Sequence, residues 1–290
     1  MSESNQRRER ERTPGERAVC PVCPHGCFLS EGQYGRCGAR KNEQGRIVSV
    51  NYGKVTSLML DPIEKKPLSR FFPGSAVLSA GSFGCNLACP FCQNYEISMA
   101  GPWQVPYREL SPARLADLAY KYREYGNIGV AFTYNEPLIG YEFVLDTARL
   151  VHERGMKNVL VTNGYAEDSV LTELLPWIDA MNIDLKGFTE SYYRRLGGDL
   201  QTVKQFIERA ARSCHVELTT LIVPGENDSE DEMEEEARWI ASVNPEIALH
   251  VTRFFPRYQM KDKKATDARS VYRLKRIAER FLTYVYTGNC

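Results

Sequence analysis

From residue 75 onward, short apolar segments alternate with segments whose apolar residues recur every three or four positions. This alternation predicts βαβ units with right-handed crossovers and a parallel sheet. About six units predict an α/β fold in the form of a partial (β/α)6 TIM-like barrel, with a doubly wound sheet as the alternative. The expected strands are 76–80, 128–133, 158–162, 180–185, 215–222 and 247–251, with a further edge strand at 284–286. The expected helices are 114–125, 141–154, 169–175, 204–213, 229–243 and 270–282.

Two different segments precede this pattern. Residues 1–18 are polar and charged and lack the apolar core of a secretory signal, which predicts a disordered tail. Residues 19–74 are rich in cysteine, glycine and proline, which predicts a small Cys-rich module held together by metal and a lead-in to the barrel at 75–290. Within the lead-in, Pro62 and Pro67 predict that residues 61–68 are extended and non-helical, and lie across the barrel face or lead into it.

The composition argues against several classes of function. The 37 Lys and Arg residues balance 37 Asp and Glu residues, so a formal net charge of +0 gives no support to nucleic-acid binding. The sequence contains no run of about 18 apolar residues, and no membrane span is expected. Clustered cysteines in a chain without a recognisable secretory signal favour metal binding over disulfides and predict a cytoplasmic protein.

Three cysteines follow the first expected strand, with the spacing C-x3-C-x2-C: Cys85, Cys89 and Cys92, here called the loop cysteines. Thiolates are soft ligands that suit iron–sulfur clusters or zinc. A four-iron cluster takes four ligands, so three thiolates leave one iron open, as in a catalytic metal site. The alternative is a zinc site with a fourth ligand from elsewhere, although this spacing is unusual for zinc.

A second set of cysteines lies in the first module: Cys20, Cys23, Cys27 and Cys37, here called the N-terminal cysteine group. Four thiolates satisfy a tetrahedral zinc ion or a four-cysteine iron–sulfur cluster equally well, and His25 could replace one of them. Because the ligand set is closed, we interpret this site as structural or electron-relaying. The spacing leaves the choice between zinc and iron–sulfur open.

The loop cysteines resemble the signature of the radical SAM superfamily. The resemblance implies that they hold a [4Fe-4S] cluster whose fourth iron binds the amino and carboxylate groups of S-adenosylmethionine (SAM). It further implies reductive cleavage of SAM to a 5′-deoxyadenosyl radical, which abstracts hydrogen from a substrate.

Polar residues follow the later strands at their carboxyl ends, where parallel α/β folds bind ligands. Asn135 and Glu136 suit the amino group of SAM, and Lys186 suits its carboxylate. Asp184 and Asn163 suit the amino or ribose groups. The resemblance supports these assignments, because residues 184–186 are similar to the Asp-x-Lys segment of pyruvate formate-lyase activating enzymes.

Two further residues complete the expected site. Tyr134 lies in residues 133–137, which resemble the Gly-Gly-Glu-type motif of radical SAM enzymes, although the glycines are replaced. His250 resembles a histidine late in the sheet of activating enzymes, near the nucleoside. A histidine buried in the core with its hydrogen bonds satisfied is an equally good interpretation of His250.

Residues 20–27, 35–38, 61–68 and 89–94 are similar to the AmmeMemoRadiSam-system radical SAM proteins, a group similar to pyruvate formate-lyase activating enzymes. This resemblance implies an oxidoreductase-type, activating-enzyme-like protein that acts on a small-molecule or protein substrate. Reduced flavodoxin or ferredoxin would be the electron donor. One alternative is an activase of a glycyl-radical enzyme. Another is a non-catalytic iron–sulfur or zinc redox scaffold, which would have no use for Glu136, Asp184 and Lys186.

Overall fold

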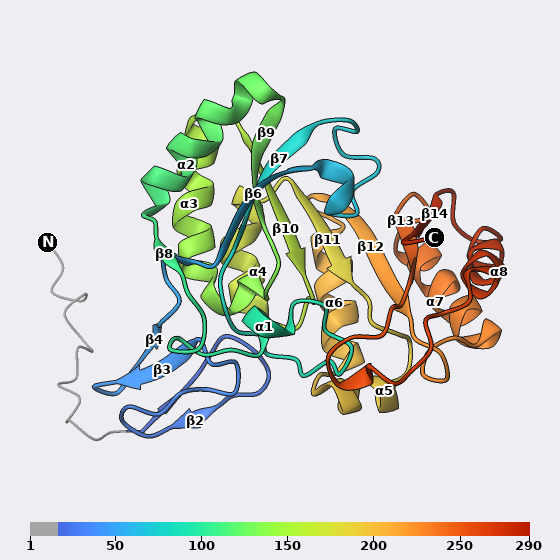
Figure 1. Cartoon of the computed structure of the whole chain (residues 1–290), viewed down its shortest axis with the longest axis horizontal. Coiled ribbons are helices and arrows are strands. Elements are labelled where there is room, and N and C mark those ends of the chain that lie inside the picture. The colour runs from blue at the N-terminus through green and yellow to red at the C-terminus, as the bar shows by residue number, and fades with distance from the viewer. Residues whose placement is uncertain (1–16) are drawn as a thin grey trace, which may run out of the picture.

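The computed structural model describes residues 17–290, so the tail expected at residues 1–18 lies almost wholly outside the described residues. Its centre is an eight-stranded sheet in the order β14-β13-β12-β11-β10-β9-β7-β6 (Figure 1). Seven strands are parallel to their neighbours, and β6 is antiparallel to β7. The strands are β6 (Ser57–Pro62), β7 (Ala76–Gly81), β9 (Asn127–Phe132), β10 (Lys157–Thr162), β11 (Ala180–Asp184), β12 (His215–Ile222), β13 (Ala248–Arg253) and β14 (Val285–Gly288).

The sheet has two free edges, β6 and β14, among the described residues. A closed barrel would join its first and last strands, so this is the partial α/β barrel that the sequence predicts. The extra edge strand is also present, because Leu249 of β13 pairs in parallel with Val285 of β14. The open edge matters for function, since it leaves one side of the barrel accessible.

Helices connect the parallel strands and follow the sheet in strand order, from α2 to α8 (Figure 1). Helix α2 begins at Pro112, where Ser111 accepts a hydrogen bond from the Arg114 amide and proline occupies the first turn. The short helix α5 was not predicted; it is capped by Thr189 and ends at Gly197 with φ +80°. The helices are α1 (Tyr95–Ser98), α2 (Pro112–Lys121), α3 (Tyr141–Glu153), α4 (Asp168–Leu174), α5 (Glu190–Leu196), α6 (Leu200–Ala210), α7 (Glu230–Val243) and α8 (Ala268–Ala278).

The two faces of the sheet pack against different partners, because successive strand residues point to opposite faces. Leu78, Val130 and Leu160 belong to the large core cluster shared with the helices. Their neighbours Val77, Ala131 and Val159 pack instead with Ile63 and Leu68. The segment 63–70, here called the strap, therefore crosses the inner face of the sheet.

The prediction for residues 61–68 is wrong in part. Residues 57–62 are extended as strand β6, but Ile63–Lys65 form a 3-10 turn, η1. The Lys66 amide donates to the Ile63 carbonyl and closes this turn. Proline at position 62 precedes the turn, where its missing N–H and fixed φ cost nothing, and so it starts a helical turn instead of preventing one.

The N-terminal module contains two small ribbons and one strand of a third, shown in blue to green in Figure 1. The ribbons are β1 (Ala18–Val19) with β2 (Phe28–Leu29), β3 (Arg40–Glu43) with β4 (Arg46–Ser49), and β5 (Lys54–Val55) with β8 (Arg108–Glu109), which comes from the barrel. Arg40 ties the module to the barrel: it is 2% exposed and donates to both Glu142 carboxylate oxygens at 2.6 and 2.7 Å. A buried bidentate pair of this kind fixes orientation as well as contact. No helix among residues 17–290 is long and apolar enough to cross a membrane.

Candidate functional site

A cavity of about 960 Å3 lies at the carboxyl ends of the parallel strands, bounded by the strap and by β14. It brings together residues that are far apart in the sequence. All three loop cysteines and every residue that the sequence analysis assigned to SAM line it: Cys85, Cys89, Cys92, Tyr134, Asn135, Glu136, Asn163, Asp184, Lys186 and His250.

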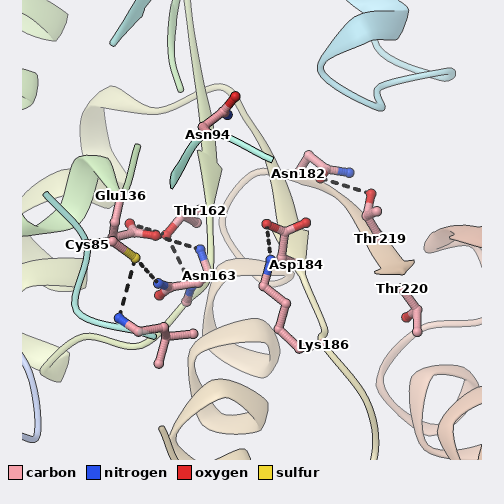
Figure 2. Close-up of polar contacts among 12 residues, drawn as sticks. Cys85, Asn94, Glu136, Thr162, Asn163, Asn182, Asp184, Lys186, Thr219 and Thr220 are labelled. Atoms are coloured by element: carbon pink, nitrogen blue, oxygen red, sulfur yellow. Dashed lines mark hydrogen bonds and ion pairs between the residues drawn. The ribbon is translucent and has the colours of Figure 1, made fainter. Parts of the chain in front are cut away.

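The loop cysteines are free thiols that follow β7. Cys85 Sγ accepts a hydrogen bond from the Leu87 amide at 3.4 Å and lies 3.7 Å from Asn163 Nδ2 (Figure 2). Burial raises the pKa of the Cys85 thiol well above its ordinary value and that of Cys89 to about 11. Thiols this reluctant to ionise become thiolates only when a cation replaces the proton. Three soft ligands on one loop facing a large cavity fit a bound metal group with a further open position.

Lys186 and Asp184 form an ion pair on the floor of the site, with Nζ and Oδ2 2.7 Å apart (Figure 2). Burial alone would lower the Lys186 pKa, but Asp184 and Cys89 outweigh it and raise the pKa above the usual range. Two hydrogen bonds fix the backbone of Lys186: its amide donates to the Tyr193 hydroxyl, and its carbonyl accepts from Asn227 Nδ2. The site therefore holds a permanent cation beside the loop cysteines.

Glu136 is buried and fully engaged by neighbouring groups. Its Oε1 accepts from Thr162 Oγ1 at 2.6 Å and its Oε2 from the Asn163 amide at 2.8 Å (Figure 2). Burial raises its pKa to about 7 despite these bonds. Glu136 thus joins the ends of β9 and β10 to each other.

Asn135 is similarly engaged. Its Oδ1 accepts from the Ser82 amide at 2.8 Å, and its Nδ2 donates to the carbonyls of Phe83 and Gly84. These contacts hold the segment that leads into Cys85. The sequence placed Asn135 at the right cavity but gave no sign that its side chain would be satisfied by the loop itself.

Tyr134 has a left-handed backbone, with φ +71°, and its hydroxyl donates to Asp61 Oδ2 at 2.6 Å. The same oxygen lies 2.8 Å from Lys66 Nζ, whose ammonium stands 4.5 Å from the Tyr134 ring centroid. Although burial opposes ionisation, Lys66 and Tyr134 lower the Asp61 pKa to about 2. Sequence reasoning missed this Asp61–Lys66–Tyr134 contact, because five and 73 residues separate its members.

His250 lies in the wall of the cavity and is not free. Its Nε2 is 2.7 Å from Glu217 Oε2, and its ring stacks on Tyr286 at 5.3 Å. Glu217 also accepts from the strap amides of Ser69 at 3.0 Å and Arg70 at 2.8 Å. The sequence analysis missed Glu217, although a carboxylate in the middle of an apolar strand signals a buried polar partner.

The N-terminal cysteine group also consists of free thiols, two buried and two half-buried. They lie close enough that Cys37 and Cys27 raise the pKa of Cys20, although burial is the larger cause. The Nε2 of His25 is 2.8 Å from the Asn86 carbonyl, so Nδ1 is the ring nitrogen left for a metal. Across residues 17–290, no three His, Cys, Asp or Glu side chains converge closely enough for a single metal ion, and this applies to both cysteine sets.

Comparison with known proteins agrees with this geometry. The family model described as the Radical SAM superfamily matches residues 81–240. The uncharacterized protein MJ0808 of Methanocaldococcus jannaschii is 39% identical over 96% of this chain and 83% of its own length. The pyruvate formate-lyase 1-activating enzyme of Escherichia coli K12 is 28% identical over 51% of this chain and 61% of its own length.

Solved structures share the fold. SuiB of Streptococcus suis superposes with a TM-score of 0.55 and 16% identity, over 72% of this chain and 48% of SuiB. Methylornithine synthase (PylB) superposes with a TM-score of 0.51 and 15% identity, over 72% of this chain and 65% of that protein. At such low identity these likenesses speak for the fold alone.

Proposed function

The chain belongs to the radical SAM superfamily, and from this premise we propose that its cavity holds a small-molecule or protein substrate from which a hydrogen atom is abstracted. Membership implies a [4Fe-4S] cluster and SAM. When bound, they supply a 5′-deoxyadenosyl radical through one-electron reductive cleavage of SAM. The observation that carries the proposal is that the loop cysteines and all the expected SAM contacts line one cavity.

Within that cavity, we assign SAM binding to side chains that can still contact a ligand. Lys186 has its charge beside the loop cysteines and is the cation for the SAM carboxylate. Asp184 orients Lys186 and accepts from the amino group. His250 and Tyr134 lie on the wall, where they border the nucleoside and help exclude water.

Glu136, Asn135 and Asn163 receive a different role in this proposal. Their polar atoms already bond protein groups at the ends of β7, β9 and β10. They keep these strand ends and the loop cysteines in fixed positions, and so pre-organise the site instead of binding SAM with a free side chain.

An activase of a glycyl-radical enzyme is the second candidate. One support is the similarity to pyruvate formate-lyase activating enzymes. A second is that the cavity is lined both by Lys65 near the β6 edge and by Thr287 of the β14 edge. A radical target carried on a loop of another protein could enter between these two edges, whereas a closed barrel would exclude it.

The proposal also includes an electron donor and a second metal centre. Reductive cleavage needs one electron, and reduced flavodoxin or ferredoxin is the donor class that we propose. We also propose that the N-terminal cysteine group binds a second metal centre, because its four thiols lie in one small module, affect one another's pKa and are soft ligands.

The test is anaerobic. The protein is reconstituted with iron and sulfide, reduced with dithionite and mixed with SAM, and 5′-deoxyadenosine is measured by mass spectrometry. The native protein should form it, and a variant with all three loop cysteines changed to Ala should not. If the fully loaded and reduced native protein neither forms 5′-deoxyadenosine nor binds SAM, the proposal is wrong.

A further inference from the structure

The N-terminal cysteine group and the loop cysteines are joined by a continuous buried contact. Asn86, which follows Cys85 directly, is 1% exposed and lies between the two sets. Its carbonyl lies 2.8 Å from Nε2 of His25, two residues after Cys23, and its Oδ1 accepts from Asn163 Nδ2 at 2.9 Å. The same Asn163 nitrogen lies 3.7 Å from Cys85 Sγ. The path His25–Asn86–Asn163–Cys85 therefore links the segment of the N-terminal cysteine group to a thiol of the loop cysteines.

A second contact brings the two sets together independently. Gly84 has φ +91°, and a Cβ at this position would clash with the Cys37 carbonyl oxygen. The backbone of the N-terminal module thus touches the residue before Cys85. Cys37 and Cys85 also line one cavity of about 380 Å3. A structural metal site could stabilise the module from any position, but here the module contacts the loop at two places, through His25 and through Cys37.

The far side of the module faces the solvent. Val19 and Phe28, the chain neighbours of Cys20 and Cys27, are 60% and 58% exposed. The thiols themselves are equally buried in the two sets, since Cys20 is 6% and Cys89 is 7% exposed. Of the two sets, only the loop cysteines line the substrate cavity. When substrate and SAM fill that cavity, a protein donor would reach the module more easily than the loop cysteines.

We propose that the N-terminal cysteine group holds a redox-active iron–sulfur cluster, and that Asn86 and Asn163 form the route by which its electron reaches the cluster of the loop cysteines. This inference rests on the proposed function, because it assigns the source of the electron for SAM cleavage. In this step the reduced second cluster would lose one electron, and the cluster of the loop cysteines would gain that electron. A flavodoxin- or ferredoxin-class protein then restores the second cluster.

The first experiment isolates the second centre. In the full chain with Cys85, Cys89 and Cys92 changed to Ala, iron, sulfide and zinc are measured, and an electron paramagnetic resonance (EPR) spectrum is recorded after reduction. About four irons per chain and a cluster signal are expected, both lost on adding Cys27→Ala. One zinc per chain without iron, or no metal in a folded protein, overturns the proposal.

The second experiment tests the route in the chain that holds both centres. Reduction of the cluster at the loop cysteines is followed by freeze-quench EPR with reduced flavodoxin or with dithionite. With flavodoxin, the cluster should be reduced about 10-fold more slowly in Asn86→Ala than in the native protein. Dithionite is a small molecule that enters the cavity directly, so it should reduce the cluster at the same rate in both proteins. Equal rates with flavodoxin overturn the route.

Cys27→Ser serves as a second variant if Asn86→Ala loads poorly, because it removes an outer ligand without touching the loop. In this variant, flavodoxin should no longer reduce the cluster at the loop cysteines, whereas dithionite should still reduce it. If both donors still reduce the cluster, the proposed relay is wrong. Formation of 5′-deoxyadenosine with dithionite in the native protein tests the proposed function separately, so a failed relay and a failed function are distinguishable.

Discussion

Lys186 Nζ lies 2.7 Å from Asp184 Oδ2, two residues earlier, and the pair sits beside the loop cysteines. The carboxylate keeps the lysine charged in a buried position, where an unpaired ammonium would tend to lose its proton. Lys186 thus keeps its positive charge inside the cavity, next to the negative charge of Asp184.

Lys186→Met should weaken SAM binding by roughly 2 kcal/mol, or about 30-fold, because a charge-assisted hydrogen bond to the SAM carboxylate is lost. Iron loading should change little, since the loop cysteines remain. Equilibrium dialysis of iron-loaded protein measures the affinity. Lys121→Met, on the exposed end of α2, is the control. Unchanged SAM affinity in Lys186→Met would remove Lys186 from the site.

Gly84→Ala should detach the N-terminal module from the barrel, because the new Cβ would overlap the Cys37 carbonyl in a left-handed backbone. We expect a loss of roughly 3 kcal/mol in unfolding free energy and faster amide exchange in residues 17–50. Gly225→Ala is a matched control, since φ there is +74° but nothing lies within 4 Å. That control should lose only about 1 kcal/mol. Equal losses would mean that backbone strain alone is responsible.

Glu217→Gln should destabilise the protein by about 2–3 kcal/mol at pH 7, because it leaves His250 and the strap amides with a weaker acceptor. Burial alone would raise the Glu217 pKa, but bonds from His215, His250 and the strap lower it to about 2. The native carboxylate therefore stabilises the fold above its ordinary pKa, and this contribution is lost as the pH falls through about 2.

Urea unfolding of the native protein and of Glu217→Gln, carried out from pH 7 down to pH 3, measures this difference. The gap in unfolding free energy should narrow toward the acid end. Glu230→Gln, in the exposed first turn of α7, serves as the control and should follow the native curve. A gap that stays constant with pH would show that the charge of Glu217 is not what holds the strap.

Glu236 on α7 should give stability the opposite pH dependence to that from Glu217. Its Oε1 accepts a hydrogen bond from Thr220 Oγ1, and burial raises its pKa to about 8. Such a group stabilises the fold below its ordinary pKa, and the contribution is lost as the pH rises through about 8. Glu236→Gln cannot ionise and should therefore be more stable than the native protein at pH 9, by on the order of 2 kcal/mol. Thermal unfolding of the native protein and of Glu236→Gln at pH 6 and pH 9 measures this difference. If the stability of the variant depends on pH as that of the native protein does, Glu236 is not the group that titrates.

Much of the fold follows from local sequence patterns. Strand β12 and helix α3 lie where periodicity predicted them, because an apolar strand or an amphipathic helix is recognisable within its own residues. Helix α5 was missed, although Thr189 and Gly197 are local signals for its start and end. The partnership of β6 with β7 was also missed, because nothing within residues 57–62 shows which strand they pair with.

That the candidate residues gather at one edge of the sheet was equally predictable, but their hydrogen-bond partners were not. Cysteine spacing identified the loop cysteines, and the carboxyl ends of parallel strands identified Asp184, Lys186 and His250, which meet in one cavity. Sequence reasoning assigned Glu136 and Asn135 to the amino group of SAM, whereas the structure occupies their polar atoms with protein partners. The type of a side chain indicates which ligands it can bind. It does not show whether other protein groups already occupy its polar atoms.

The sequence by itself determined the cysteine spacing, the order of strands and helices, and hence the edge of the sheet at which the chemistry-bearing residues gather. Only the tertiary structure decided which of them remain available. His250 meets Glu217 across 33 residues, and Asn163 meets Asn86 across 77. Such contacts depend on how strands and loops pack in three dimensions, because buried polar groups take whichever partner the fold brings within hydrogen-bond distance.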